Sequence, residues 1–184
     1  MKNPVAVLKI PLRPGREYET RFDRKQSPFR MFAIPVASVM LGSIITAMPV
    51  IEAQALLPPF GFMMFLAWRL MRPGLWPMWA GLPFGLFDDM FSGQPFGSAG
   101  LLWSLVMLGM ELLDARALWR DHWQDWFIAS VLIIVVLLGG LWFAGLAYAH
   151  ADANTLWPQI MLSILIFPLV VRLCSWFDNL RLST

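Results

Sequence analysis

The sequence has few of the side chains that build catalytic and metal sites. Its 184 residues include one cysteine, Cys174, and two histidines, His122 and His150. A single thiol excludes an intrachain disulfide and a cysteine-based metal cluster. The sequence also lacks the Ser, His and Asp set of a hydrolase and a phosphate-binding glycine loop. These absences predict a protein that has no catalytic centre, cofactor or metal ion and is not an enzyme.

Charge is also scarce. Charged residues make up 14% of the chain and hydrophobic residues 58%, and the mean hydropathy is +0.62. No charged residue occurs in 31–51 or in 126–149. A transmembrane helix needs about 20 apolar residues, so both stretches are long enough to cross a bilayer. The first stretch is longer than the apolar part of a signal peptide, which favours an uncleaved span. We therefore expect an all-α polytopic membrane protein.

Six apolar segments follow one another, and they predict a bundle of about six transmembrane helices. The second and third segments are short, and each contains two prolines, Pro58 and Pro59 in one and Pro77 and Pro83 in the other. Proline kinks or breaks a helix. These two segments are therefore expected to be kinked spans or a re-entrant hairpin. The expected spans are 31–51, 53–70, 75–91, 96–113, 126–149 and 156–177.

Positive charge is concentrated at the N terminus. Residues 1–30 contain eight of the fourteen Lys and Arg residues and three acidic residues. A basic segment beside a membrane span is typical of the cytoplasmic side, where it contacts anionic lipids. Few aromatic residues are available there for base stacking, so nucleic-acid binding is not expected. The predicted organisation is a basic cytoplasmic tail at 1–30, a single transmembrane bundle at 31–177 and a short cytoplasmic tail at 178–184.

The positions of the remaining basic residues favour one number of membrane spans over another. With six spans, every Lys and Arg lies on the same side as the basic tail, and the opposite loops hold Glu52, His150 and Asp152. With five spans, Arg172 and Arg181 would lie on the opposite side. Because basic loops stay in the cytoplasm, an even number of spans is favoured. We expect six rather than four, in a bacterial inner membrane, with both termini cytoplasmic.

Ionisable side chains within the spans are candidates for function because they are costly in lipid. Arg69, Glu111 and Arg172 lie within about a turn of the expected cytoplasmic interface, so snorkelling or mutual pairing is enough to explain them. Asp88 and Asp89 lie near the outer end of the third segment. Adjacent carboxylates on a helix diverge by about 100°. They are therefore not expected to share a proton or a metal ion.

Small residues recur on one face of the third segment. Gly81, Gly85, Asp89 and then Ser92 or Gly93 are spaced by three or four residues and so share one helical face. The two first glycines form a GxxxG pair, which lets another helix approach closely, and a carboxylate on such a face points into protein. The face is a candidate surface for helix packing or partner binding.

The residues from 85 to 97 read Gly-Leu-Phe-Asp-Asp-Met-Phe-Ser-Gly-Gln-Pro-Phe-Gly. This run resembles the hallmark of the rod shape-determining MreD family: Gly-Leu, two variable positions, Asp, two variable positions, Ser-Gly, then Pro, a large apolar residue and Gly. The family's acid corresponds to Asp89, and Asp88 falls on a variable position. The sequence departs from the family at Phe60 after Pro59, where members often carry Asp. Together with the helical face, the resemblance gives the candidate site residues Gly81, Gly85, Asp89, Ser92, Gly93, Pro95 and Gly97.

The resemblance implies a non-enzymatic membrane scaffold of the cell-wall elongation machinery. Such a protein is expected to bind the single-span protein MreC. Through MreC it would help couple cytoplasmic MreB filaments to the peptidoglycan polymerase RodA and its transpeptidase partner, and so maintain rod shape.

Two other hypotheses are open from the sequence. A substrate-binding membrane subunit of an energy-coupling-factor transporter has a similar size, and there Asp88 and Asp89 would contact a vitamin or a metal ion. A lipid-modifying enzyme is the other hypothesis. For it, the run Asp114-Ala115-Arg116 supplies a fragment of the lipid phosphotransferase signature, without the upstream Gly and the two later Asp residues.

Overall fold

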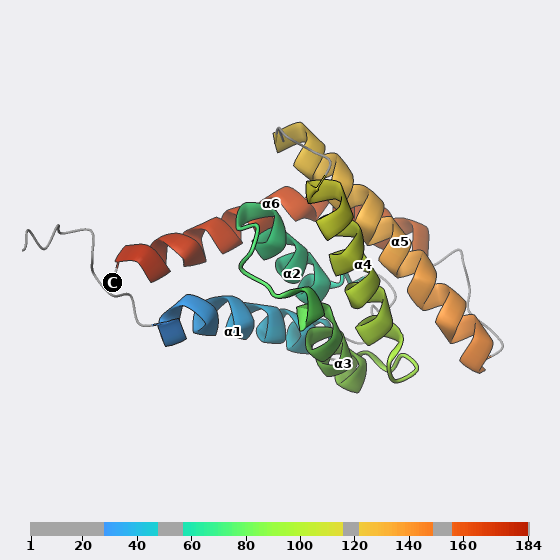
Figure 1. Cartoon of the computed structure of the whole chain (residues 1–184). Coiled ribbons are helices and arrows are strands. Elements are labelled where there is room, and N and C mark those ends of the chain that lie inside the picture. Colours follow the sequence, from blue (N-terminus) through green and yellow to red (C-terminus); the bar gives the residue numbers. More distant parts are fainter. Residues whose placement is uncertain (1–27, 48–56, 116–121, 149–155, 184) are drawn as a thin grey trace, which may run out of the picture.

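The computed structural model describes residues 28–47, 57–115, 122–148 and 156–183, and the regular elements within these ranges are all helices. The prediction of an all-α chain with six helices is confirmed (Figure 1). Residues 1–27 of the predicted lipid-binding tail lie outside the described residues, and 28–30 form the start of the first helix. The elements are α1 (Pro28–Ala47), α2 (Phe60–Met71), the 3₁₀ helix η1 (Met78–Ala80), α3 (Gly81–Ser92), α4 (Ser98–Asp114), α5 (His122–Tyr148) and α6 (Leu156–Ser183).

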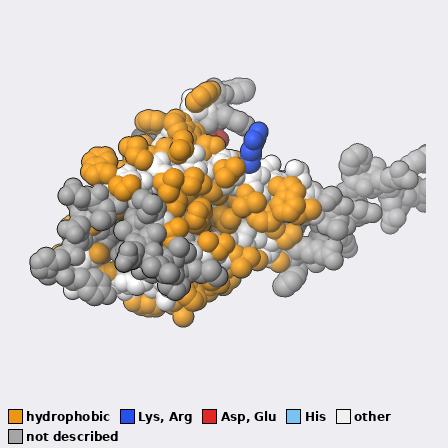
Figure 2. All heavy atoms as spheres, turned by 180° about the vertical axis from the view of Figure 1, so that it is seen from behind, with side chains coloured by type: hydrophobic (Ala, Val, Ile, Leu, Met, Phe, Trp, Pro, Cys, Tyr) orange, Lys and Arg blue, Asp and Glu red, His pale blue; other side chains and the backbone are white. Residues whose placement is uncertain are grey.

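Helices α5 and α6 are long and apolar enough to cross a membrane. The most apolar 18 residues within their parts Trp123–Ala147 and Leu156–Leu180 have mean hydropathies of 2.7 and 2.1. Each part has 25 residues and spans about 37 Å, more than the ~30 Å hydrocarbon core of a bilayer. Of the most apolar 18 residues in each, 17% and 28% are buried inside the fold, so most of this surface faces outward. Figure 2 shows hydrophobic side chains over much of one face of the molecule, which is typical of a membrane-facing surface.

Helix α2 forms the core of the bundle. Every residue from 61 to 69 is buried, and the helix contacts α1, α5 and α6. The ring of Phe65 stacks on Trp103 of α4 and on Trp76 of the α2–η1 connection, with centroids 5.3 and 5.9 Å apart. With 12 residues, α2 is only about 18 Å long. Because protein surrounds it, its ends do not have to reach the lipid headgroups.

The prolines of the second and third segments lie at helix ends. Pro59 is the residue before α2, and Pro77 is the residue before η1. Pro83 lies in the first turn of α3, where its missing N–H breaks no helical hydrogen bond. These prolines therefore delimit α2 and α3 and do not kink them, contrary to expectation. The prolines that lie beyond the first turn of a described helix are Pro35 of α1 and Pro168 of α6.

The helix ends differ from the expected segments in several places. Residues 57–59 and 75–77 are not helical, so α2 and α3 begin later than expected. Helix α6 continues to Ser183, beyond the expected end of the last span at 177. The start of α1 and the end of α6 lie on the same side of the molecule (Figure 1). The described bundle thus begins and ends on one side.

Candidate functional site

Helix α3 lies directly on α4 through two glycines. A β-carbon built on Gly81 would lie 2.6 Å from the carbonyl oxygen of Trp103, and one on Gly85 would lie 2.5 Å from the carbonyl oxygen of Ala99. Both distances are far below a van der Waals contact, and the atoms met belong to backbone that cannot rotate away. Glycine therefore lets the two helix backbones touch. Gly81, Gly85 and Asp89 form the buried face of α3.

Asp89 caps the first turn of α4. Its carboxylate accepts hydrogen bonds from the N–H groups of Gly97, Ala99 and Gly100 at 2.9 to 3.2 Å and from the Ser98 hydroxyl at 3.2 Å. The first N–H groups of a helix have no partner within it, and the helix dipole is positive there. The N-cap residue is a glycine without a side chain, so a carboxylate from the neighbouring helix takes its role. The α4 N terminus thus stabilises a charge on a residue that is 5% exposed.

The connection between α3 and α4 depends on two left-handed glycines. Gly93 ends α3 with a φ of +67°, and Gly97 precedes α4 with a φ of +96°. Residues with a β-carbon rarely adopt such angles. Between them, the carbonyl of Pro95 accepts a hydrogen bond from the Ser98 N–H at 3.0 Å. The turn directs the chain back so that the start of α4 meets Asp89.

The seven candidate residues lie in one unit, which we call the α3–α4 hairpin (residues 81–114). Ser92 and Gly93 are exposed, however, so they do not share the buried face of α3 as expected. Asp88 lies on another side of α3, next to α1 and α2. A β-carbon built on Gly61 of α2 would meet the Ser43 hydroxyl of α1 and would lie 3.1 Å from Asp88 Oδ1. Asp88 and Ser92 also line a cavity of about 330 Å³. The two adjacent carboxylates thus have separate environments, as their angular separation on the helix predicts.

Residues 23–177 match the sequence model of the family described as rod shape-determining protein MreD. The chain belongs to the MreD family. The match includes the whole α3–α4 hairpin, and membership gives the protein a role in rod shape determination. Together with the two membrane-length helices, it also indicates a membrane location. No curated protein and no solved structure shows a significant match to the chain.

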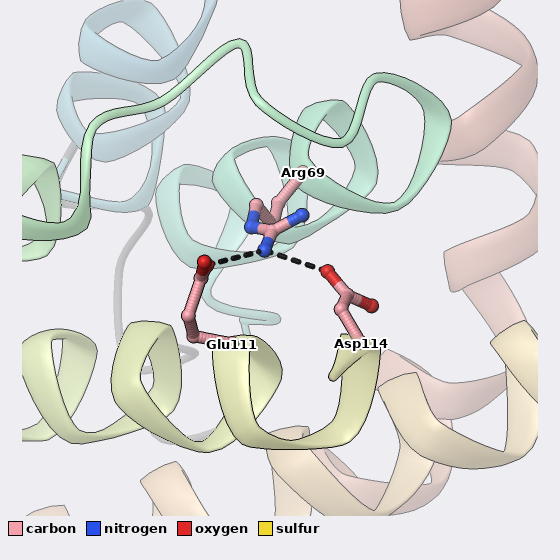
Figure 3. Close-up of polar contacts among 3 residues, drawn as sticks. All are labelled: Arg69, Glu111 and Asp114. Carbon is pink, nitrogen blue, oxygen red and sulfur yellow. Dashed lines mark hydrogen bonds and ion pairs between the residues drawn. The ribbon is translucent and has the colours of Figure 1, made fainter. Parts of the chain in front are cut away.

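In this MreD-family chain, ion pairs join helices at the end of α4 that is farther from the Asp89 cap. Arg69 of α2 is 3% exposed, and its Nη2 lies 3.1 Å from Glu111 Oε2 and 2.7 Å from Asp114 Oδ2 (Figure 3). Arg72 Nη2 lies 2.6 Å from Asp178 Oδ2 of α6. Helix α2 is thus tied to α4 and to α6 by charge as well as by packing.

Part of this network could be predicted from the sequence and part could not. The expected pairing among Arg69, Glu111 and Arg172 holds for the first two. Arg172 instead lines a separate groove between α2, α5 and α6. Asp114 and Asp178 were not expected as partners. The available signal was that both lie near the same expected membrane interface as the arginines they bind.

Methionine in place of Arg69 is expected to lower the free energy of unfolding of the chain by about 1 to 2 kcal/mol, less than the ~3 to 5 kcal/mol typical of a broken buried pair. The loss is small because Glu111 is 59% exposed and reaches solvent when its partner is removed. In addition, Nε and Nη1 of Arg69 have no hydrogen-bond partner, so their removal relieves an unfavourable burial. Thermal unfolding in detergent measures the effect.

The matched control for that experiment is methionine in place of Arg72. Its side chain is 43% exposed, so its pair with Asp178 is expected to contribute no more than about 1 kcal/mol. A loss above ~3 kcal/mol for Arg69→Met would show that Glu111 and Asp114 cannot be solvated, against this account.

Proposed function

We propose that this chain is a non-enzymatic integral membrane scaffold of the cell-wall elongation machinery. It binds MreC and, through MreC, helps couple MreB filaments to peptidoglycan synthesis by RodA and the elongation transpeptidase. The family match over residues 23–177 is the observation that carries the proposal. The use of the carboxylates of Asp89, Glu111 and Asp114 in a helix cap and in ion pairs supports it, because these contacts hold helices together.

The proposed topology has six spans in the bacterial inner membrane. The bundle at 31–177 lies between cytoplasmic tails at 1–30 and 178–184, and the first tail contacts anionic lipids. Two observations support this topology. The start of α1 and the end of α6 lie on one side of the molecule. Arg69 and Arg72 lie at the end of α2, where the positive-inside rule places the cytoplasm.

Reporter fusions that end at Gly74 and at Phe96 test this topology. Gly74 lies between α2 and η1, and Phe96 lies in the turn between α3 and α4. We expect the first fusion to be fluorescent as a cytoplasmic reporter and inactive as alkaline phosphatase, and the second to give the opposite result. Phosphatase activity of the Gly74 fusion would contradict six spans.

Copurification with MreC tests the proposed function. The tagged full-length chain is coexpressed with MreC of the same organism and extracted in mild detergent, with an unrelated single-span protein as the negative control. We expect MreC to be retained and the unrelated protein to be lost. Folded chain that retains no MreC would overturn the proposal.

In the proposed scaffold, the α3–α4 hairpin stabilises the fold and does not itself contact MreC. Alanine in place of Asp89 is expected to reduce MreC recovery only as far as it reduces the amount of folded chain. Folded Asp89→Ala protein at the wild-type level, with full MreC recovery and normal rod growth, would show that Asp89 contributes to neither.

A further inference from the structure

A cavity of about 330 Å³ lies beside the α3–α4 hairpin, at the end of the bundle opposite to Arg69. Its volume is within the usual range for small-molecule pockets, and as a water-filled space it would hold about ten molecules. Residues from all six helices form its wall. One from each of α1 to α6 is Thr46, Phe62, Asp88, Trp103, Gly140 and Gln159.

The polar part of the wall holds a carboxylate without a described ion-pair partner and an amide oxygen without a hydrogen bond. No described Lys, Arg or His forms an ion pair with Asp88. The Gln94 Oε1 atom is buried without a hydrogen bond. The Ser43 hydroxyl lies beside the Asp88 carboxylate and is its hydrogen-bond partner, but a neutral hydroxyl does not balance the charge. By contrast, the Thr46 hydroxyl and the Gln159 amide are bonded to backbone groups. Buried charges and polar groups are costly unless they are paired, so the unbalanced charge of the partly buried Asp88 and the unbonded oxygen of Gln94 point to a missing cation that can donate a hydrogen bond.

The rest of the wall restricts what that partner can be. The rings of Phe62, Phe91 and Trp103 line the cavity, and the faces of aromatic rings attract cations. An anion would be repelled by Asp88. A divalent metal ion prefers several oxygen ligands, and the described part of the chain has no group of three His, Cys, Asp or Glu side chains that could hold one.

We propose that this cavity binds an organic ammonium group attached to an apolar body. The ammonium group pairs with Asp88 and donates a hydrogen bond to Gln94 Oε1, and the apolar body lies against Leu102 and Val136. Asp89 cannot take this role because the α4 N terminus already balances its charge. The ligand is either the ethanolamine headgroup of a phospholipid or a free primary amine. Its binding is separate from the binding of MreC.

Two pairs of probes test the proposal on the purified full chain. Hexylamine is compared with hexanol, which has the same chain length and no charge, and binding is followed by the shift of the thermal midpoint. Phosphatidylethanolamine is compared with phosphatidylglycerol of the same acyl chains, and bound lipid is counted by native mass spectrometry. A ligand that binds only the folded state raises the stability of that state. We therefore expect hexylamine to raise the thermal midpoint, or phosphatidylethanolamine to remain bound, up to a saturating level.

Three variants assign the signal to the cavity. Asp88→Asn removes the charge and keeps the shape, and Gly140→Leu fills the space, since a β-carbon there lies 3.8 Å from Gln94 Oε1. Asp125→Asn changes a carboxylate of α5 that lines a different groove. We expect Asp88→Asn to weaken binding at least tenfold, Gly140→Leu to abolish it and Asp125→Asn to leave it unchanged. Asp88→Asn changes the charge of the cavity and Gly140→Leu changes its volume. If one of these variants fails to fold, the other still tests the proposal.

The pattern across the probes decides the outcome. Selective binding of hexylamine supports a free amine, and selective binding of phosphatidylethanolamine supports a lipid headgroup. Equal binding of the charged and uncharged members of each pair would overturn the proposal. So would wild-type affinity in a folded Asp88→Asn variant, or no binding of any probe.

Discussion

Alanine in place of Asp89 is expected to lower the thermal midpoint of the purified chain by about 10 °C. The substitution leaves the N–H groups of Ala99 and Gly100 without an acceptor at the buried start of α4. An unsatisfied buried group costs about 1 to 3 kcal/mol and a lost N-cap about 1 kcal/mol, so the total is about 4 kcal/mol. Unfolding in detergent, followed by tryptophan fluorescence, measures the shift.

Two variants control this experiment. Asp89→Asn keeps one acceptor oxygen and is expected to lose about half as much stability. Asp88→Ala removes the adjacent carboxylate, which has no described ion pair, and is expected to change the free energy of unfolding by less than about 1 kcal/mol. Equal losses for Asp88→Ala and Asp89→Ala would contradict the separate environments of the two carboxylates.

Leucine in place of Gly85 is expected to prevent α3 from packing on α4 and to remove most of the folded chain from the membrane. The added β-carbon would lie 2.5 Å from the Ala99 carbonyl oxygen and from the Gly100 Cα atom, so the helices must separate. Overpacking costs about 1 to 3 kcal/mol where side chains can adjust, and backbone contacts adjust less, so the loss is at least about 3 kcal/mol. The amount of monodisperse chain after size-exclusion chromatography measures it.

Alanine in place of Gly109 is the matched control on the other half of the hairpin. A β-carbon there meets nothing within 4 Å. Alanine is favoured over glycine in a helix by about 1 kcal/mol, so this variant is expected to be at least as stable as the wild type. A Gly85→Leu chain that is recovered at the wild-type level and restores rod growth would contradict the close α3–α4 contact.

The sequence was sufficient to predict those features that depend on local spacing. Apolar runs predicted six helices, and the spacing of Gly81, Gly85 and Asp89 placed them on one face, which is the buried face of α3. The positive φ of Gly93 and Gly97 gives a physical reason for two further glycines of the family pattern.

Features that depend on three-dimensional packing could not be predicted from the sequence. A proline can kink a helix or begin one, and only the fold shows that Pro59 precedes α2 and that Pro83 lies in the first turn of α3. Likewise, Arg69 and Asp114 are distant in sequence, and their contact depends on how α2 crosses α4. The Asp88 cavity needs residues from six helices, so no local pattern reveals it.

Hydrogen exchange at the start of α4 tests most directly whether Asp89 acts as the cap that fixes the hairpin. The amides of Ala99 and Gly100 are measured by mass spectrometry in the wild-type chain and in Asp89→Ala, with peptides from α6 as the internal reference. We expect slow exchange in the wild type and exchange at least about tenfold faster in the variant, with a smaller increase in α6. Equal exchange of these two amides in both proteins would contradict the account.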